Sequence, residues 1–218
     1  HFSWVKVVDG LPFQAPGYLT TDQAEAAIDW IQAQDRRWLC YLAVTAAHAP
    51  LHAPPANLHG FTLANPYPLP GEDPIPYFHA MIEALDTELG RLFDVLDFAT
   101  THVILVGDNG SSDATILPPF TTSQNKGSVY EGGTRVPLIV KSPAVVGPGR
   151  VVTAMVNTVD VLATMAELLG FDLAPLGLPV NDSISFAPHL GNPSQAPMRK
   201  HAFSENFQPL GYGPYTRI

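Results

Sequence analysis

The chain has 218 residues, of which 46% are hydrophobic and 14% are charged, a composition typical of a folded globular domain rather than a disordered segment. Its formal net charge is −9 and no stripe of Lys and Arg is present, which argues against nucleic acid as a partner. No apolar run approaches the roughly 18 residues that span a bilayer, and a single cysteine excludes an intrachain disulfide.

The first elements come before a proline-rich segment. Residues 1–20 show no clear periodicity. The segment 21–34 predicts a helix, with Asp22 and Glu25 spaced as in a capping box at its start. Residues 37–45 form a continuous apolar run, which is typical of a strand covered on both faces of a parallel or mixed sheet.

The middle of the chain predicts a loop, a long helix and two strands. Residues 50–76 contain eight prolines, too many for regular structure, and we expect a long surface loop that faces the substrate. Residues 77–98 predict the clearest helix, and the runs 102–107 and 135–143 predict buried strands. The apolar stripe of the helix consists of Phe78, Met81, Ile82, Leu85, Leu89, Leu92, Phe93 and Leu96.

The last clear element is a helix at 158–170, with Thr158 as its expected N-cap and Gly170 at the C-cap position. Helices that alternate with continuous apolar strands indicate an α/β layered fold with a parallel or mixed central sheet. Ligands bind beyond the carboxyl ends of the strands in such sheets. The candidate chemistry therefore lies just after the apolar runs.

Asp108 and Asn109 follow the predicted strand 102–107 and leave three interpretations open. With Gly110 they form a sequence that favours a tight turn. They could instead cap a helix. As a third alternative, a carboxylate and an amide carbonyl are hard oxygen ligands that suit Ca²⁺ or Mg²⁺, although two ligands do not make a site.

His48 follows the apolar run 37–45, and His52 lies four residues later. Two such histidines could indicate zinc, but that spacing needs a helix to bring both rings to one side, and the prolines forbid one. A second candidate loop, 125–137, contains Lys126 and three glycines. It is either a flexible charged loop or an anion site in which glycines admit a close backbone approach.

The order of these segments closely resembles the sulfatase family of the alkaline-phosphatase-like superfamily. The resemblance rests on YLAVTAAHAPLHAP, HVILVGDNG, NKGSVYEGGTRVPLIVKSP and VNTVDVLATMAELLG, and covers roughly residues 17–205. It implies that Asp108 and Asn109 ligate a divalent cation, usually Ca²⁺, with Mg²⁺ as the alternative. It also implies that His48 and Lys126 contact the sulfate or its leaving oxygen, where either could protonate the leaving alcohol.

The chain departs from the family pattern at the nucleophile. Sulfatases use a formylglycine made from Cys or Ser in a Cys/Ser-x-Pro-x-Arg motif, and neither Cys40 nor Ser194 lies in one. The paired acidic metal ligands of the family's first strand are missing too. We therefore expect residues 1–218 to be a single partial catalytic domain, its middle and later part, without the N-terminal strands and the C-terminal subdomain.

The resemblance implies a parent protein that hydrolyses a sulfated small molecule or glycan, while the chain alone is expected to be inactive. Family habit suggests export to periplasm, lysosome or the outside. The alternatives are a phosphate or phosphonate monoester hydrolase of the same superfamily, a truncated product without catalysis, and an α/β domain with no active site. Asn109 argues against a two-metal phosphatase, which would favour a histidine there.

Overall fold

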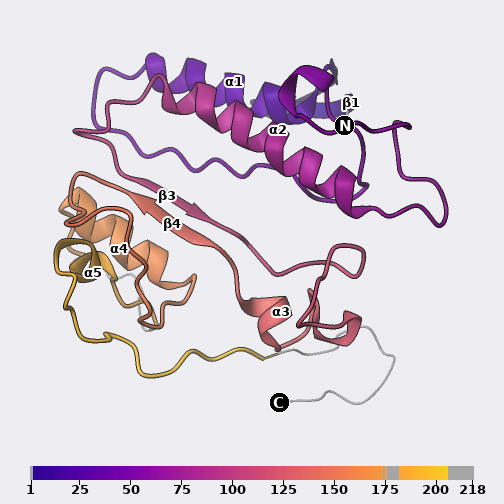
Figure 1. Ribbon diagram of the computed structural model, residues 1–218. Helices are drawn as coiled ribbons and strands as arrows, with labels where there is room; N and C mark the ends of the chain where they lie inside the picture. The colour runs from indigo at the N-terminus through magenta and orange to yellow at the C-terminus, as the bar shows by residue number, and fades with distance from the viewer. Residues whose placement is uncertain (1, 174, 176–181, 206–218) are drawn as a thin grey trace. The chain divides into compact units, whose positions relative to one another are not determined.

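The structure, a computed structural model, describes residues 2–173, 175 and 182–205. The chain divides into two compact units, His1–Leu96 and Asp97–Ile218. Each unit has its own two-stranded antiparallel sheet and its own helices (Figure 1). The predicted parallel or mixed pairing is therefore not seen in the described part of the chain.

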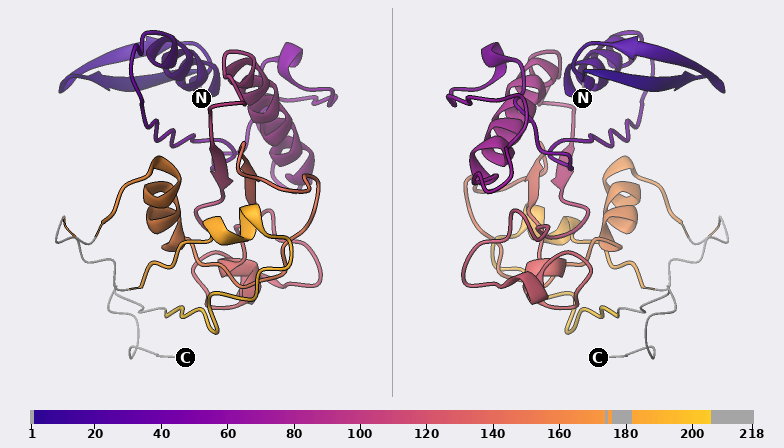
Figure 2. Two further views of the ribbon diagram at one scale, coloured as in Figure 1. Left: turned by 90° about the vertical axis from the view of Figure 1, so that its left-hand side faces the viewer. Right: turned by 90° about the vertical axis from the view of Figure 1, so that its right-hand side faces the viewer.

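A β-hairpin opens the first unit. Strand β1 (Ser3–Val8) pairs antiparallel with β2 (Leu11–Pro16), and Figure 2 shows the hairpin reaching beyond helix α1. The turn residues Asp9 and Gly10 have φ values of 52° and 80°. Asp-Gly favours such a two-residue turn, in which both residues need positive φ. Residues 1–20 show no clear periodicity, and Asp-Gly is the one local signal of this hairpin in the sequence.

Two helices, α1 (Leu19–Gln32) and α2 (Ile75–Phe93), pack side by side in the first unit (Figures 1 and 2). Both were predicted, but the capping box at Asp22 is wrong. Because α1 begins at Leu19, Asp22 lies inside the first turn, where its carboxylate pairs with Lys6 at 2.6 Å.

The buried face of α2 differs from the stripe of large apolar residues. Ile82 is 43% exposed, whereas the small residues Ala80 and Ala84 are fully buried. Glu88 is buried as well, and its carboxylate accepts hydrogen bonds from Thr21 Oγ1 and Arg91 Nη1, both at 2.5 Å. Ala84 packs in a cluster with Tyr18 and Leu58, and a count of large apolar residues does not detect such small buried side chains.

The strand predicted at 37–45 is wrong. Its side chains do alternate, since Trp38, Cys40 and Leu42 are half-buried while Leu39 and Tyr41 are exposed. However, no described segment forms a ladder with this run, and a strand needs a neighbour for its backbone groups. The segment is therefore irregular, with one face packed against the helices.

The proline-rich stretch 50–76 is irregular as predicted, apart from the 3₁₀-helix η1 (Ala56–Leu58) and the first residues of α2. Its prolines remove backbone donors and fix φ, which prevents longer helices or ladders. Among residues 2–173, 175 and 182–205, no helix combines the length and the hydropathy that a membrane span requires.

The second unit is built on strands β3 (Val103–Val106) and β4 (Leu138–Lys141), which confirms the two predicted strands with shorter bounds. Their predicted burial is wrong, because Leu105, Val106 and Ile139 are exposed and no residue of either strand is fully buried. They pair antiparallel, with Val103 opposite Lys141 and Val106 opposite Leu138. The connection between them contains the 3₁₀-helix η2 (Thr122–Gln124) and the short helix α3 (Glu131–Thr134).

The second unit ends with helices α4 (Asp160–Leu169) and α5 (Ala187–Gly191). Gly170 closes α4 in the left-handed conformation with φ 75°, which confirms the predicted C-cap. The predicted N-cap Thr158 is wrong, because Val159 occupies that position without a side-chain cap. The Asp160 carboxylate instead accepts the amide of Asn157 at 2.8 Å.

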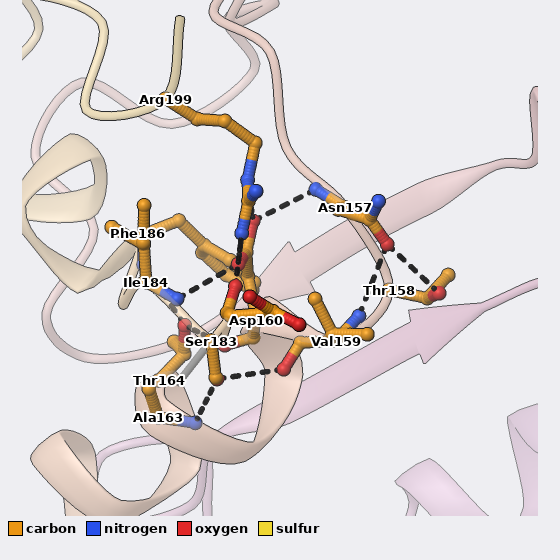
Figure 3. Close-up of polar contacts among 11 residues, drawn as sticks. Asn157, Thr158, Val159, Asp160, Ala163, Thr164, Ser183, Ile184, Phe186 and Arg199 are labelled. Atoms are coloured by element: carbon orange, nitrogen blue, oxygen red, sulfur yellow. Dashed lines mark hydrogen bonds and ion pairs between the residues drawn. The ribbon is translucent and has the colours of Figure 1, made fainter. Parts of the chain in front are cut away.

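Asp160 is also the centre of a polar network that joins three segments (Figure 3). Its carboxylate accepts the amide of Ile184 and two hydrogen bonds from the Arg199 guanidinium, at 3.0 and 2.5 Å. Asp160 is only 2% exposed. Burying a carboxylate costs free energy unless it is paired and hydrogen-bonded, and this network meets both needs.

Candidate active site

Asp108 and Asn109 occupy a turn just after the end of β3. The backbone amide of Asn109 donates to Asp108 Oδ1 at 2.8 Å, and Asn109 Nδ2 donates to the carbonyl of Gly110 at 3.0 Å. Asp108 is exposed and Asn109 is half-buried. Within the described part of the chain, these bonds leave Asp108 Oδ2 and Asn109 Oδ1 as hard oxygen atoms for another partner.

The chain after this turn runs beside the loop that contains Lys126. The amide of Gly110 donates to the carbonyl of Gly133 at 2.9 Å, and the amide of Ser111 donates to the carbonyl of Gly132 at 3.2 Å. The Lys126 amide in turn donates to the carbonyl of Ser111 at 2.7 Å. These bonds hold the backbone of Lys126 beside the turn, inside one unit, and its side chain is exposed.

Three glycines make this close approach sterically feasible. A Cβ atom on Gly110 would lie 2.0 Å from the carbonyl oxygen of Gly132, and one on Gly132 would lie 2.3 Å from that of Gln124. On Gly133 it would lie 2.4 Å from the carbonyl oxygen of Asn125. Only glycine fits at these positions. The sequence predicted glycines that admit a close backbone approach, and here the approach is between two protein segments.

The Asp108–Asn109 pair fits a hard divalent cation in its chemistry but supplies only part of a site. Ca²⁺ takes about 6–8 oxygen ligands. Among the residues that the structure describes, no group of three or more His, Cys, Asp or Glu side chains could hold a metal ion. A cation at this turn would therefore need further ligands from water or from other segments.

His48 lies in the other unit, in the irregular segment after residues 37–45. Its amide donates to the carbonyl of Thr45 at 2.8 Å, and its ring Nδ1 lies 2.8 Å from the carbonyl oxygen of Ala49. A carbonyl only accepts, so Nδ1 donates in this contact and Nε2 is the ring nitrogen that the contact does not use. The exposed ring borders a small hollow that is also lined by Leu19, Thr20, Thr45, Ala46, His52 and Met81.

His52 borders the same hollow but is only 3% exposed. Its ring packs edge-on against Phe2 and Tyr18, and Nδ1 lies 2.8 Å from the carbonyl oxygen of Pro50. Burial lowers the pKa of His52, and the bond to Pro50 only partly counteracts this. The imidazole is therefore neutral at neutral pH and belongs to the packing around Phe2 and Tyr18. No zinc ion is needed to explain a histidine at this position.

Cys40, the single cysteine of the chain, does not lie in the surroundings of a reactive thiol. Cys40 is half-buried rather than enclosed in a sheet, and burial raises the pKa of its thiol. Such a thiol stays protonated at neutral pH and reacts slowly. The 218 residues contain no Cys/Ser-x-Pro-x-Arg motif.

One residue near the site was missed by sequence reasoning. The side-chain amide of Gln23, on α1, bonds to the backbone of Ala43 and of Thr45, 20 and 22 residues away. A glutamine inside an amphipathic helix looks like any solvated residue, so no local pattern could have identified this contact.

The Sulfatase family model matches residues 4–171, and the chain belongs to the sulfatase family. A sulfatase of Formosa agariphila is 30% identical over 199 residues, which cover 83% of this chain and 35% of that protein. The N-acetylgalactosamine-6-sulfatase of Canis lupus familiaris is 27% identical over 183 residues, 78% of this chain and 32% of that protein. The chain thus spans about a third of the length of these relatives.

The fold also has solved counterparts. The crystal structure of Ps i-CgsB is similar with a TM-score of 0.69 at 24% identity, over 84% of this chain and 40% of that one. The same protein in complex with k-i-k-neocarrahexaose has a TM-score of 0.67. This likeness supports the predicted α/β fold.

Proposed function

We propose that the protein to which this chain belongs hydrolyses sulfate esters, and that Asp108, Asn109, Lys126 and His48 take part in the reaction. Family membership supports the class of reaction. The main observation in support of the candidate site is the 2.7 Å hydrogen bond from the Lys126 amide to the Ser111 carbonyl. It keeps the backbone of a cationic residue beside the Asp108–Asn109 turn. An anionic ester fits such a pairing of Lys⁺ with a cation-binding turn.

Each side chain has a defined role in this proposal. Asp108 and Asn109 provide two ligands for Ca²⁺, with Mg²⁺ as the alternative, and the bound cation would supply positive charge to the sulfate oxygens. Lys126 donates hydrogen bonds to the sulfate and to the leaving oxygen as negative charge develops there. His48, or Lys126 itself, donates the proton that the leaving alcohol requires.

The chain forms a single partial catalytic domain, residues 1–218, of an alkaline-phosphatase-like layered fold. Because these residues contain no Cys/Ser-x-Pro-x-Arg motif, the formylglycine nucleophile must be supplied from outside them, and the isolated chain is inactive. The chain's short share of its relatives' length supports this proposal.

The substrate that fits best is a sulfated glycan. The support comes from the names of the relatives, since one is an N-acetylgalactosamine-6-sulfatase and a protein of similar fold was solved with k-i-k-neocarrahexaose. A small sulfated alcohol or phenol would meet the same charged groups. The negative net charge gives no reason to expect nucleic acid.

The proposal is tested on the product of the whole gene, with Ca²⁺ present. An activated aryl sulfate and the matching aryl phosphate are compared at equal leaving group, so that only the transferred group differs. We expect repeated turnover of the sulfate and a kcat/KM higher than that for the phosphate. A reversed preference would assign the protein to the phosphate-ester hydrolases of the same superfamily.

A further inference from the structure

A helix side chain takes the place of a neighbouring strand beside the segment that leads to His48. Gln23 Nε2 donates to the carbonyl of Ala43 at 3.1 Å, and Gln23 Oε1 accepts the amide of Thr45 at 3.1 Å. The same Nε2 lies 3.3 Å from Thr45 Oγ1. One side-chain amide therefore satisfies a carbonyl and an amide two residues apart on one edge of the chain.

This pattern matters because the segment has no ladder of its own. A residue of an adjacent strand bonds in a similar way to a carbonyl and an amide on one edge of its neighbour. Residues 37–45 have no such strand among the described segments. Gln23 is half-buried, and its bond with the amide of Thr45 is partly buried, which strengthens that bond, whereas the bond to Ala43 is exposed.

The contact extends directly to His48. The carbonyl of Thr45, whose amide Gln23 binds, accepts the amide of His48 at 2.8 Å. Leu19 and Thr20, from the first turn of the same helix, line the hollow that the His48 ring borders. Helix α1 thus contacts both the backbone before the histidine and the space in front of its ring.

We infer that Gln23 is a positioning residue for His48: it ties the Ala43–Thr45 backbone to α1 and thereby fixes where the imidazole is presented. Its importance for catalysis rests on the proposed role of His48, but the contact itself does not. A general acid held about 1 Å out of place loses much of its effect, so such an anchor acts on rate without touching substrate.

The test uses amide hydrogen exchange, measured by NMR on the full 218-residue chain, which needs no catalytic activity. Gln23→Met removes both bonds at similar side-chain volume and helix propensity. Gln23→Glu keeps an acceptor for the Thr45 amide but loses the donor to Ala43. The exposed Gln32→Met, near the end of the same helix, is the matched control.

Removing the contact should speed exchange at Thr45 and His48 by roughly fivefold to tenfold in Gln23→Met, about the effect of one net hydrogen bond. Gln23→Glu should keep more protection at Thr45 than Gln23→Met does. The amides of α2 and all amides of Gln32→Met should keep the wild-type rates. Wild-type exchange at Thr45 and His48 in Gln23→Met, or an equal acceleration across the unit, would overturn the inference.

A second readout links the contact to the reaction in the product of the whole gene. Gln23→Met should lower kcat for an aryl sulfate by about tenfold or more with a much smaller change in KM, because the geometry of proton transfer is altered and sulfate binding is not. Exchange that changes while wild-type and variant kcat agree would leave the anchor in place but remove His48 from the proposed chemistry. The two outcomes therefore separate the failure of the inference from that of the proposed function.

Discussion

Gly110 donates its amide hydrogen to the carbonyl of Gly133 at 2.9 Å, and this bond ties the Asp108–Asn109 turn to the loop that carries Lys126. The two backbones approach so closely that no side chain fits between them. The arrangement of the candidate site thus depends on glycines that carry no chemistry themselves.

The first prediction concerns this contact. Gly133→Ala should lower the free energy of unfolding of its unit by about 2 kcal/mol or more, because the new Cβ would lie 2.4 Å from Asn125 O and 2.6 Å from Ser128 O. Urea unfolding followed by circular dichroism measures the change. Gly90→Ala, in helix α2 with nothing within 4 Å of the new Cβ, should be neutral or stabilising. Equal effects of the two substitutions would contradict the steric account.

The second prediction concerns the buried ion pair. Arg199→Met should cost about 3 kcal/mol, because it leaves the Asp160 carboxylate buried without a positive partner. Arg135→Met removes a largely exposed pair with Glu131 in the same unit and should change stability by no more than about 0.5 kcal/mol. Comparable losses in both variants, measured by urea unfolding, would show that burial does not decide the cost.

The pH dependence of the same pair provides a third prediction. Burial raises the pKa of Asp160, but the bonds from Arg199 and from two backbone amides outweigh it, so the pKa lies below its usual value. The folded state then binds fewer protons than the unfolded state, whose pKa is about 3.9. The resulting stabilisation is complete above that pH and is lost as the pH falls through the lower folded value. In Asp160→Asn the free energy of unfolding should depend less on pH below about pH 4 than it does in the wild type. An unchanged pH dependence would refute the assignment.

Local sequence patterns predicted what depends on near neighbours. The spacing before Gly170 predicted a left-handed C-cap, and short apolar runs predicted β3 and β4. Asp9-Gly10 is also a local hairpin signal, but the flanking residues lack the clear alternation of apolar and polar side chains that predicts strands.

Contacts between residues far apart in the sequence could not be predicted from such local patterns. Asp160 and Arg199 are 39 residues apart, and neither is unusual where it stands in the sequence. The apolar run 37–45 has the composition of a strand, but a strand exists only where a partner runs beside it. For the same reason the roles of Asp108, Asn109, Lys126 and His48 came from a family resemblance, not from spacing.

A fourth prediction uses the buried histidine of the first unit. Because burial lowers the pKa of His52, the folded state resists a proton that the unfolded state accepts at about pH 6.5. The stability of this unit should therefore fall as the pH drops from about 7.5 to 5. His52→Phe, which suits the surrounding Phe2 and Tyr18 rings, should reduce this fall, whereas His79→Gln, at an exposed position, should not.

Tryptophan fluorescence measures the unfolding of this unit alone, because all three tryptophans of the chain lie in it. Parallel pH curves for wild type and His52→Phe would contradict the prediction.

The fifth prediction concerns the cation. Two oxygen ligands should bind Ca²⁺ only weakly in the isolated chain, with a Kd of about 1 mM or higher. A Ca²⁺ titration followed by NMR should shift the amides from Asp108 to Ser111, and Asp108→Ala should abolish these shifts. Asp113→Ala removes a nearby exposed carboxylate and serves as the control. Micromolar binding would contradict a site with only two protein ligands. Shifts that persist in Asp108→Ala would place the cation elsewhere.

The most direct test of the account is turnover of an activated aryl sulfate, with Ca²⁺, by three samples: the whole gene product, its Lys126→Ala variant and the isolated 218-residue chain. We expect repeated turnover by the whole product and a loss in kcat of about 10²–10³-fold in Lys126→Ala, the usual effect of removing one preorganised donor. Lys200→Ala, another exposed lysine, should match the wild type. The isolated chain should show no turnover, because loss of a nucleophile costs on the order of 10⁴–10⁶ in rate. Repeated turnover by the isolated chain, or full activity without Lys126, would contradict the account.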